Sequence, residues 1–182
     1  MKKRGRPRKS LIRERMQTIV DALGVTYGYE IYKVYQDAYT SVDLRSMYYH
    51  LRKGLVLEEF EEVGVQEVKG EFTWGDTSIR KYYILGPAAK ERADDGLHIV
   101  VKTLGLNYQD PNDFLDWGAF SQKKLEQMKL EFDKLKGKPA ANREKLEVLN
   151  KKVGGLCVWL DGKVKIKEFE ELRKSIESKL KI

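Results

Sequence analysis

The chain has 182 residues, of which 41% are hydrophobic and 35% charged, and this is enough apolar material to bury the core of one large or two small domains. Its single cysteine, Cys157, excludes a disulfide framework and a cysteine-rich zinc site, while its net charge of +7 favours a polyanionic partner. No apolar run reaches the roughly 18 residues that cross a bilayer, and the basic start lacks the apolar segment of a signal peptide, so we expect a cytoplasmic protein with no membrane partner.

The positive charge is concentrated at the N-terminus. Residues 1–15 hold eight Lys or Arg against one acid, Glu14, which accounts for the whole net charge. Gly5 and Pro7 disfavour a helix, so residues 1–9 are predicted to form a disordered, extended tail. The stretch Arg4-Gly5-Arg6-Pro7 resembles the AT-hook, a short motif that enters the minor groove of A·T-rich DNA. The tail residues expected to contact nucleic acid are Lys2, Lys3, Arg4, Arg6, Arg8 and Lys9. The alternative is a tail that only improves solubility.

Three helices are predicted after the tail. Ser10 is a suitable N-cap and Gly24 a suitable end for a helix over 11–23, and a second helix follows over about 28–38. The third is predicted over 42–53, between Ser41 and Gly54. At 100° per residue its packed side holds Leu44, Met47, Tyr48 and Leu51. The opposite side and its edge hold Arg45, Ser46, Tyr49, His50 and Lys53. These residue types suit a helix that reads the major groove, although an ordinary solvated face has the same pattern.

The pattern then changes to two β-prone segments, "LVLEEFEEVGV" and "RKYYIL", joined by a turn at "TWGDTS". Three helices followed by a hairpin is the order of a winged helix-turn-helix domain, here placed at residues 10–95. Arg80 and Lys81 lie where the hairpin, or wing, would meet the phosphate backbone. The same segment carries the acidic residues Glu58, Glu59, Glu61, Glu62, Glu67 and Glu71, which must face away from bound phosphates.

Three stretches of this half resemble the PadR-like winged-helix family. They are Tyr27-Gly28-Tyr29-Glu30-Ile31 at the second helix, Met47, Tyr48 and Leu51 in the third helix, and Lys81-Tyr82-Tyr83 in the last strand. The resemblance implies a dimeric DNA-binding regulator. The chain departs from the family pattern at "LGPAAKER", where a Thr-Glu-Lys-Gly-like string is expected, and in the length of its wing.

Residues 96–182 are predicted to form a mainly helical region with a small β-hairpin, which makes the whole chain an α+β protein. Pro87 favours the start of a helix toward Leu104, with a strand at "HIVVKTLGL" as the alternative. A long helix is predicted from Asp110-Pro111 to about Lys136, and shorter helices around residues 143–153 and after Lys167. Between these two, "LCVWLDGKVKI" predicts two strands joined by Asp161-Gly162.

The long helix carries a narrow apolar stripe, and narrow stripes flanked by Lys and Glu suit paired helices. The stripe consists of Leu125, Met128, Phe132 and Leu135. We expect it to form a homodimer interface, with intrachain packing and the binding of another protein as alternatives.

The sequence favours a non-enzyme without a cofactor. It has two histidines, His50 and His98, and neither lies at a metal-ligand spacing from another His, Cys or carboxylate. "KVGGLC" lacks the lysine and hydroxyl of a phosphate-binding loop.

We therefore expect a homodimeric nucleic-acid-binding regulator, with transcriptional control of DNA as the leading function. The alternative is a factor that binds ribosomal RNA, with ribosomal proteins as further partners, and regulates translation by bridging subunits. A protein-interaction adaptor with an incidental tail is the third hypothesis.

Overall fold

The computed structural model covers the 182 residues and describes all of them except residues 1–9, 73–74, 91–93, 95 and 182. The chain divides into two compact units, Met1–Phe114 and Leu115–Ile182. The first contains α1 (Leu11–Leu23), β1 (Thr26–Tyr27), α2 (Gly28–Ala38), α3 (Leu44–Val56), β2 (Phe60–Phe72), β3 (Gly75–Leu85), α4 (Leu97–Thr103) and α5 (Pro111–Phe114). The second contains α6 (Trp117–Leu135), α7 (Arg143–Leu160) and α8 (Lys167–Leu180). The described residues thus form an α+β protein, as expected.

Helix α1 begins and ends where its capping residues predict. The hydroxyl of Ser10 accepts a hydrogen bond from the backbone N–H of Arg13, with 3.4 Å between the heavy atoms. Gly24 ends the helix at a φ of +69°, and a Cβ at this position would lie 2.1 Å from the carbonyl oxygen of Gln109. Only glycine fits both the backbone angle and the close approach.

Helix α3 begins and ends later than predicted. Asp43, instead of Ser41, is the N-cap, because its carboxylate accepts a 2.8 Å hydrogen bond from the backbone N–H of Ser46. Gly54 does not end the helix but lies within it. A Cβ on Gly54 would be 2.3 Å from the ring of Phe60, so the glycine serves to let this fully buried ring pack against the helix.

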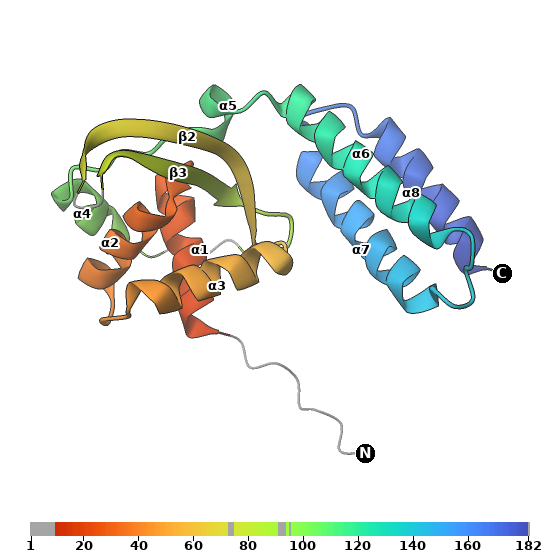
Figure 1. Ribbon diagram of the computed structural model, residues 1–182, viewed down its shortest axis with the longest axis horizontal. Helices are drawn as coiled ribbons and strands as arrows, with labels where there is room; N and C mark the ends of the chain where they lie inside the picture. Colours follow the sequence, from red (N-terminus) through yellow and green to blue (C-terminus); the bar gives the residue numbers. More distant parts are fainter. Residues whose placement is uncertain (1–9, 73–74, 91–93, 95, 182) are drawn as a thin grey trace, which may run out of the picture. The chain divides into compact units, whose positions relative to one another are not determined.

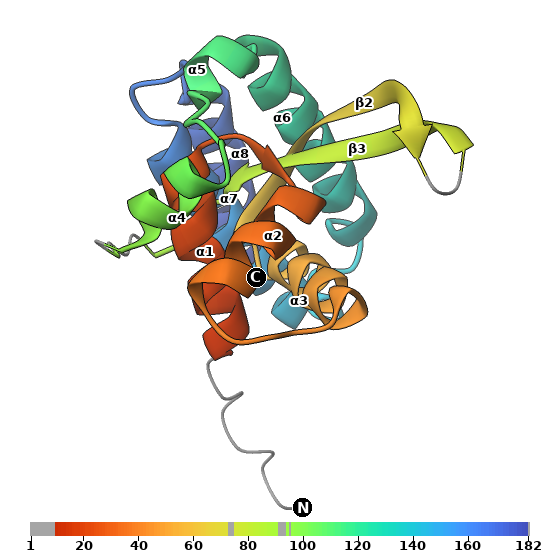
Figure 2. The same cartoon turned by 90° about the vertical axis from the view of Figure 1, so that its left-hand side faces the viewer.

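Strands β2 and β3 form the long hairpin of a three-stranded antiparallel sheet with the order β1-β3-β2 (Figure 1). Phe60 pairs with Leu85 and Glu67 with Ile79, and bulges interrupt the register between Glu62 and Gly64 and near the turn. Figure 2 shows that the hairpin projects beyond the helices of this unit. Its base is anchored because Phe60 and Tyr83 enter the core.

The core of the first unit lies between α1, α2, α3 and α4. It consists of Met16, Ile19, Val20, Leu23, Ile31, Val34, Tyr35, Met47, Leu51, Phe60, Tyr83, Leu97 and Val101. Because Leu97 and Val101 of α4 belong to this core, the unit continues to Phe114, whereas the sequence placed its boundary at residues 95–96.

The segment that follows β3 differs from the sequence expectation. Pro87 does not open a helix, since the first helix after β3 among the described residues is α4. The chain is instead held in a turn, because Gly86 and Ala88 donate backbone hydrogen bonds to the carbonyls of Glu59 and Glu58. The alternative strand at "HIVVKTLGL" is also wrong: Leu97 and Val101 bury the same side of a helical turn.

The second unit is an antiparallel bundle of α6, α7 and α8 with its own core. The long helix expected from residue 111 is interrupted after α5, because Asp116 caps α6 by accepting a 3.0 Å hydrogen bond from the N–H of Ala119. The core contains Leu125, Phe132, Leu135, Leu146, Leu149, Val153, Leu156, Cys157, Leu160, Phe169, Leu172 and Ile176.

The predicted β-hairpin at "LCVWLDGKVKI" is wrong. Helix α7 continues through this stretch to Leu160, because Val153, Leu156 and Leu160 recur at helical spacing and are buried against the other two helices. Asp161-Gly162 forms a turn between helices instead of strands, with Gly162 at a φ of +75°.

Candidate nucleic-acid interface

The outer side of α3 is exposed where the sequence predicts it. Arg45, Tyr49 and Lys53 all lie at the surface, and the side chain of Tyr49 is 64% exposed. Within the part of the chain that the structure describes, neither Arg45 nor Lys53 forms an ion pair with a carboxylate. Ser46 is half-buried in the first turn, where its backbone N–H bonds to the cap Asp43. The outer side of α3 therefore presents two uncompensated cations and an aromatic ring.

His50 connects this side of α3 to the beginning of α1. Its Nδ1 lies 3.3 Å from the hydroxyl oxygen of Ser10, the first described residue after the basic tail. Burial, and next the positive charge of Arg13, hold the pKa of His50 below its usual value, which favours the neutral ring. The Arg13 guanidinium in turn donates a 2.7 Å hydrogen bond to the carboxylate of Glu59. These contacts fix the root of the tail beside α3.

The six tail residues expected to contact nucleic acid lie outside the described residues. They are Lys2, Lys3, Arg4, Arg6, Arg8 and Lys9.

Leu44 and Tyr48, which were expected to pack in the core, instead border an open groove. Leu44 and Tyr48 are 39% and 43% exposed, while the buried side of α3 consists of Met47, Leu51 and Gly54. The groove has a volume of about 690 Å³ and lies between the first turns of α2 and α3 and strand β3. It is lined by Tyr27, Gly28, Tyr29, Lys33, Leu44, Tyr48, Glu71, Ser78, Ile79, Arg80, Lys81 and Tyr83.

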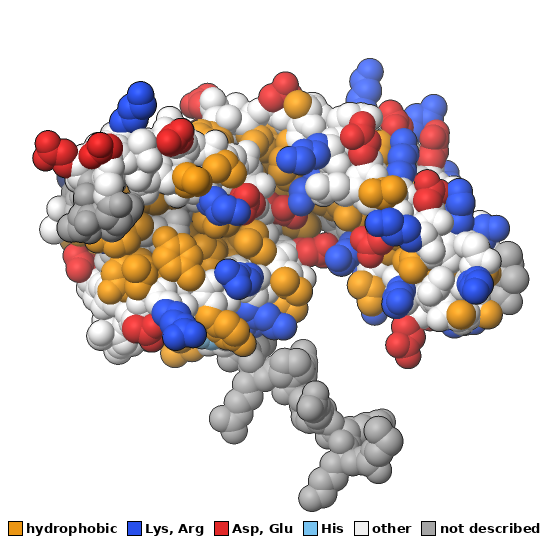
Figure 3. Space-filling view, viewed as in Figure 1, with side chains coloured by type: hydrophobic (Ala, Val, Ile, Leu, Met, Phe, Trp, Pro, Cys, Tyr) orange, Lys and Arg blue, Asp and Glu red, His pale blue; other side chains and the backbone are white. Residues whose placement is uncertain are grey.

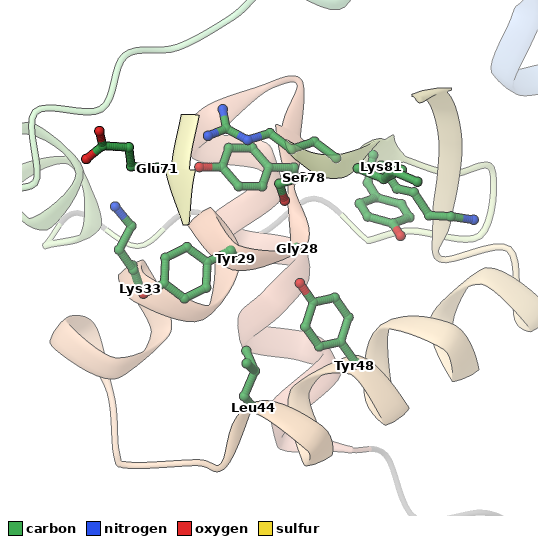
Figure 4. Close-up of a pocket in the computed structure, with 12 residues that line it drawn as sticks. Gly28, Tyr29, Lys33, Leu44, Tyr48, Glu71, Ser78 and Lys81 are labelled. Atoms are coloured by element: carbon green, nitrogen blue, oxygen red, sulfur yellow. The ribbon is translucent and has the colours of Figure 1, made fainter. Parts of the chain in front are cut away.

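Hydrophobic and positively charged side chains gather together over this part of the first unit. Figure 3 shows hydrophobic side chains between the hairpin and α3, with Lys and Arg side chains around them. In Figure 4 the rings of Tyr29 and Tyr48 face the open space of the groove from α2 and α3, and Lys33 lies beside Tyr29.

The two hairpin residues expected to contact phosphate differ in their surroundings. The Arg80 guanidinium lies over the ring of Tyr27, 4.4 Å from its centroid. The Lys81 ammonium pairs with Glu62 at 3.1 Å, and this carboxylate compensates part of its charge. Arg80 is therefore the better candidate for a phosphate contact.

The acidic residues of the hairpin segment differ in their surroundings. Glu59 pairs with Arg13, Glu62 pairs with Lys81, and Glu61 is buried. Glu67 is exposed on the hairpin, and Glu71 lines the groove itself. Glu71 therefore does not meet the requirement that the acids face away from the interface, and Glu62 stands beside the lining residue Lys81.

Sequence reasoning missed Tyr29 and Lys33 of α2, which line the groove. They lie four residues apart, and the Lys33 ammonium is 5.6 Å from the centroid of the Tyr29 ring. The signal was available, because Ile31, Val34 and Tyr35 define the buried side of α2 and leave Tyr29 and Lys33 on the other.

The four residues assigned to a homodimer interface are used within the chain. Leu125, Phe132 and Leu135 are buried in the core of the second unit, and Met128 packs against that core. The narrow stripe of α6 is therefore covered by α7 and α8. This is the intrachain packing that the sequence left as the alternative to a homodimer interface.

Among the described residues, no three His, Cys, Asp or Glu side chains lie close enough together to hold a metal ion. None of the described helices has the length and apolar character that would let it cross a bilayer.

No protein-family model and no curated protein matches this chain.

Proposed function

We propose that this protein is a regulatory nucleic-acid-binding protein in which α3, the hairpin and the basic tail contact one nucleic acid. Duplex DNA is the leading target and control of transcription the leading process. The proposal includes two further points: the first unit is related to the PadR-like winged-helix family, and the tail acts as an AT-hook. Homodimerisation is also part of it, although α6 no longer supplies the surface.

The observation that carries the proposal is the position of the tail's root. The 3.3 Å contact between Ser10 and His50 places the beginning of α1 against α3, beside the exposed Tyr49. A stretch of nine residues reaches at most about 30 Å when extended. The tail cations and the outer side of α3 are therefore able to contact the same nucleic acid.

The chemistry of the α3 surface agrees with this target. The major groove of B-DNA admits one helix, and Arg45 on such a helix has the geometry to donate two hydrogen bonds to a guanine edge. Lys53 and the tail supply positive charge that can contact phosphates. Such phosphate contacts carry no sequence information, but they provide most of the affinity. Specificity is then expected from α3 and salt-dependent affinity from the tail.

A binding series at increasing salt tests the proposal. The full chain is titrated against a fluorescein-labelled DNA duplex and a labelled RNA hairpin, with fluorescence anisotropy as the readout. Substituting Arg4, Arg6 and Arg8 together with Ala should weaken binding to all DNA sequences and make the log-log salt slope shallower by about 2.7, or 0.9 for each lost phosphate contact. Arg45→Ala and Tyr49→Ala should instead change which sequences are preferred, with an unchanged circular dichroism spectrum.

A matched control removes the same charge elsewhere. Substituting the exposed Lys123, Lys145 and Lys151 of the second unit with Ala should leave the salt slope unchanged. The proposal fails if the intact chain binds neither DNA nor RNA at low salt. It also fails if the control weakens binding as much as the tail substitution.

Ribosomal RNA is the second candidate target, and one observation favours it. The rings of Tyr29 and Tyr48 are 46% and 43% exposed and border the same groove. Single-stranded regions of RNA are recognised by stacking of their bases on aromatic side chains. If this candidate is right, the protein should sediment with ribosomal particles in a sucrose gradient of a cell lysate instead of remaining near the top.

A further inference from the structure

The groove between α2, α3 and β3 has features of a built site. Its volume of about 690 Å³ falls in the range of ligand pockets, roughly 300–1,000 Å³. Tyr83, which is almost fully buried, belongs to its lining, while Tyr29 and Tyr48 stand half-exposed beside the open space (Figure 4). A Cβ on Gly28 would lie 2.6 Å from the ring of Tyr48, so only a glycine at this position leaves room for the ring where it lies.

The aromatic lining indicates a flat, apolar ligand. Tyr29 and Tyr48 are both partly exposed, and Tyr29 already stacks on the ring of Tyr32 with 5.9 Å between the ring centroids. Aromatic side chains of this kind gain free energy when a further ring stacks on them. Leu44 and Ile79 add apolar surface, and the Ile79 side chain is 72% exposed. Burial raises the pKa of Tyr48 above its ordinary value, which favours the neutral phenol.

The charged residues of the lining indicate that the ligand also carries negative charge. Three cations, Lys33, Arg80 and Lys81, face one carboxylate, Glu71. Lys33 and Arg80 already lie over the rings of Tyr29 and Tyr27, so cations and rings are neighbours in this groove. Even with Glu62 beside Lys81, the lining and its partners keep a positive excess.

A ring system that carries an anionic group is the chemistry of a nucleotide. Inside a duplex, the faces of a base are covered by its neighbours in the stack, so a tyrosine ring cannot reach them. Unpaired nucleotides offer a free π-face to aromatic residues and a phosphate to Lys and Arg. We propose that this groove binds an unpaired nucleotide that adjoins the duplex region of the target, an inference that rests on the proposed function.

Two matched probes test this inference on the intact protein. Both contain the same hairpin stem labelled with fluorescein, one with a blunt end and one with a five-nucleotide single-stranded 3′ extension, and each is made as RNA and as DNA. The readout is the ratio of the two dissociation constants at one salt concentration. One stacked base should make the extended probe bind about tenfold more tightly.

Three substitutions locate the effect in the groove. Tyr29→Leu and Tyr48→Leu should each bring the ratio close to one, because they remove a stacking surface. Ile79→Glu should do the same by placing a carboxylate near the bound phosphate, and this exposed position leaves the core intact. Tyr108→Leu is the matched control, since Tyr108 is 59% exposed and does not line the groove; it should keep the tenfold ratio.

Each outcome decides a different question. A tenfold ratio that the groove substitutions abolish supports the inference, and whichever of the RNA and DNA pairs shows it identifies the source of the nucleotide. A ratio near one for the unchanged protein, or a tenfold ratio that survives all three substitutions, overturns the inference. If neither probe binds at low salt, the proposed function itself fails.

Discussion

At the scale of single residues, the junction of His50 with Ser10 and Arg13 couples the beginning of α1 to the candidate interface. The ring of His50 is half-buried, and its Nδ1 faces the Ser10 hydroxyl at 3.3 Å. Arg13, its charged neighbour, is itself paired with Glu59. Both burial and the Arg13 charge oppose a second proton on this ring, so protonation should loosen the junction.

This junction predicts a loss of stability in mild acid. The pKa of His50 lies below its ordinary value of 6.5 in the folded protein, so the unfolded chain takes up the proton first as the pH falls. The free energy of unfolding should therefore decrease from pH 7.5 to pH 5.5. Urea unfolding followed by circular dichroism measures it, and His50→Gln should show a smaller decrease than the wild type.

His98 provides the control for this measurement, because it is the other histidine and is exposed on α4. His98→Gln should retain the pH dependence of the wild type. Equal losses of stability in the wild type and His50→Gln would contradict the role given to this junction.

At the scale of elements, residues 156–164 were predicted to form a β-hairpin, whereas the structure places them at the end of α7 and in the turn that follows it. Helix α7 includes Gly154, whose missing Cβ would meet only the side chain of Arg173 at 3.5 Å, an ordinary contact. The turn after α7 includes Gly162 at a φ of +75°, which disfavours any residue with a Cβ. The same substitution at these two glycines should thus have opposite effects.

Gly154→Ala should stabilise the second unit by about 0.5–1 kcal/mol, because alanine has the higher helix propensity. Gly162→Ala should destabilise it by about 1 kcal/mol, because alanine pays for a left-handed backbone. Thermal unfolding followed at the helical band of the circular dichroism spectrum measures both. Destabilisation by Gly154→Ala would argue against a continuous α7.

At the scale of the whole molecule, the chain contains two units with separate cores. The nucleic-acid residues proposed above all belong to residues 1–114, while the apolar stripe of α6 serves the second core. A bundle of this size is near the lower limit at which a hydrophobic core alone suffices, so its packing is expected to be sensitive to single changes.

Division of the chain should therefore separate binding from the helical bundle. Residues 115–182 produced alone should give a helical circular dichroism spectrum and a cooperative thermal transition. Leu149→Ala, at a fully buried position, should remove about 2–5 kcal/mol and abolish that transition. Residues 1–114 alone should retain salt-dependent binding to nucleic acid, and binding by residues 115–182 in place of 1–114 would contradict this division.

The sequence by itself determined the features that depend on neighbouring residues. Ser10 and Gly24 delimit α1, and the 3.6-residue period places Arg45 and Tyr49 on the outside of α3. These signals are local, because caps, backbone angles and helix faces are set within a few residues.

Only the tertiary structure decided which apolar surfaces are covered. The run "LCVWL" suits a strand as well as a helix, and packing against α6 and α8 selects the helix. The same packing uses the α6 stripe that had been assigned to a dimer. Tyr48 has the spacing of a core residue, but the space beside it at the first turns of α2 and α3 stays unfilled, so its ring borders the groove. A short apolar pattern says that a surface will be buried, and contacts between residues distant in the sequence determine against what.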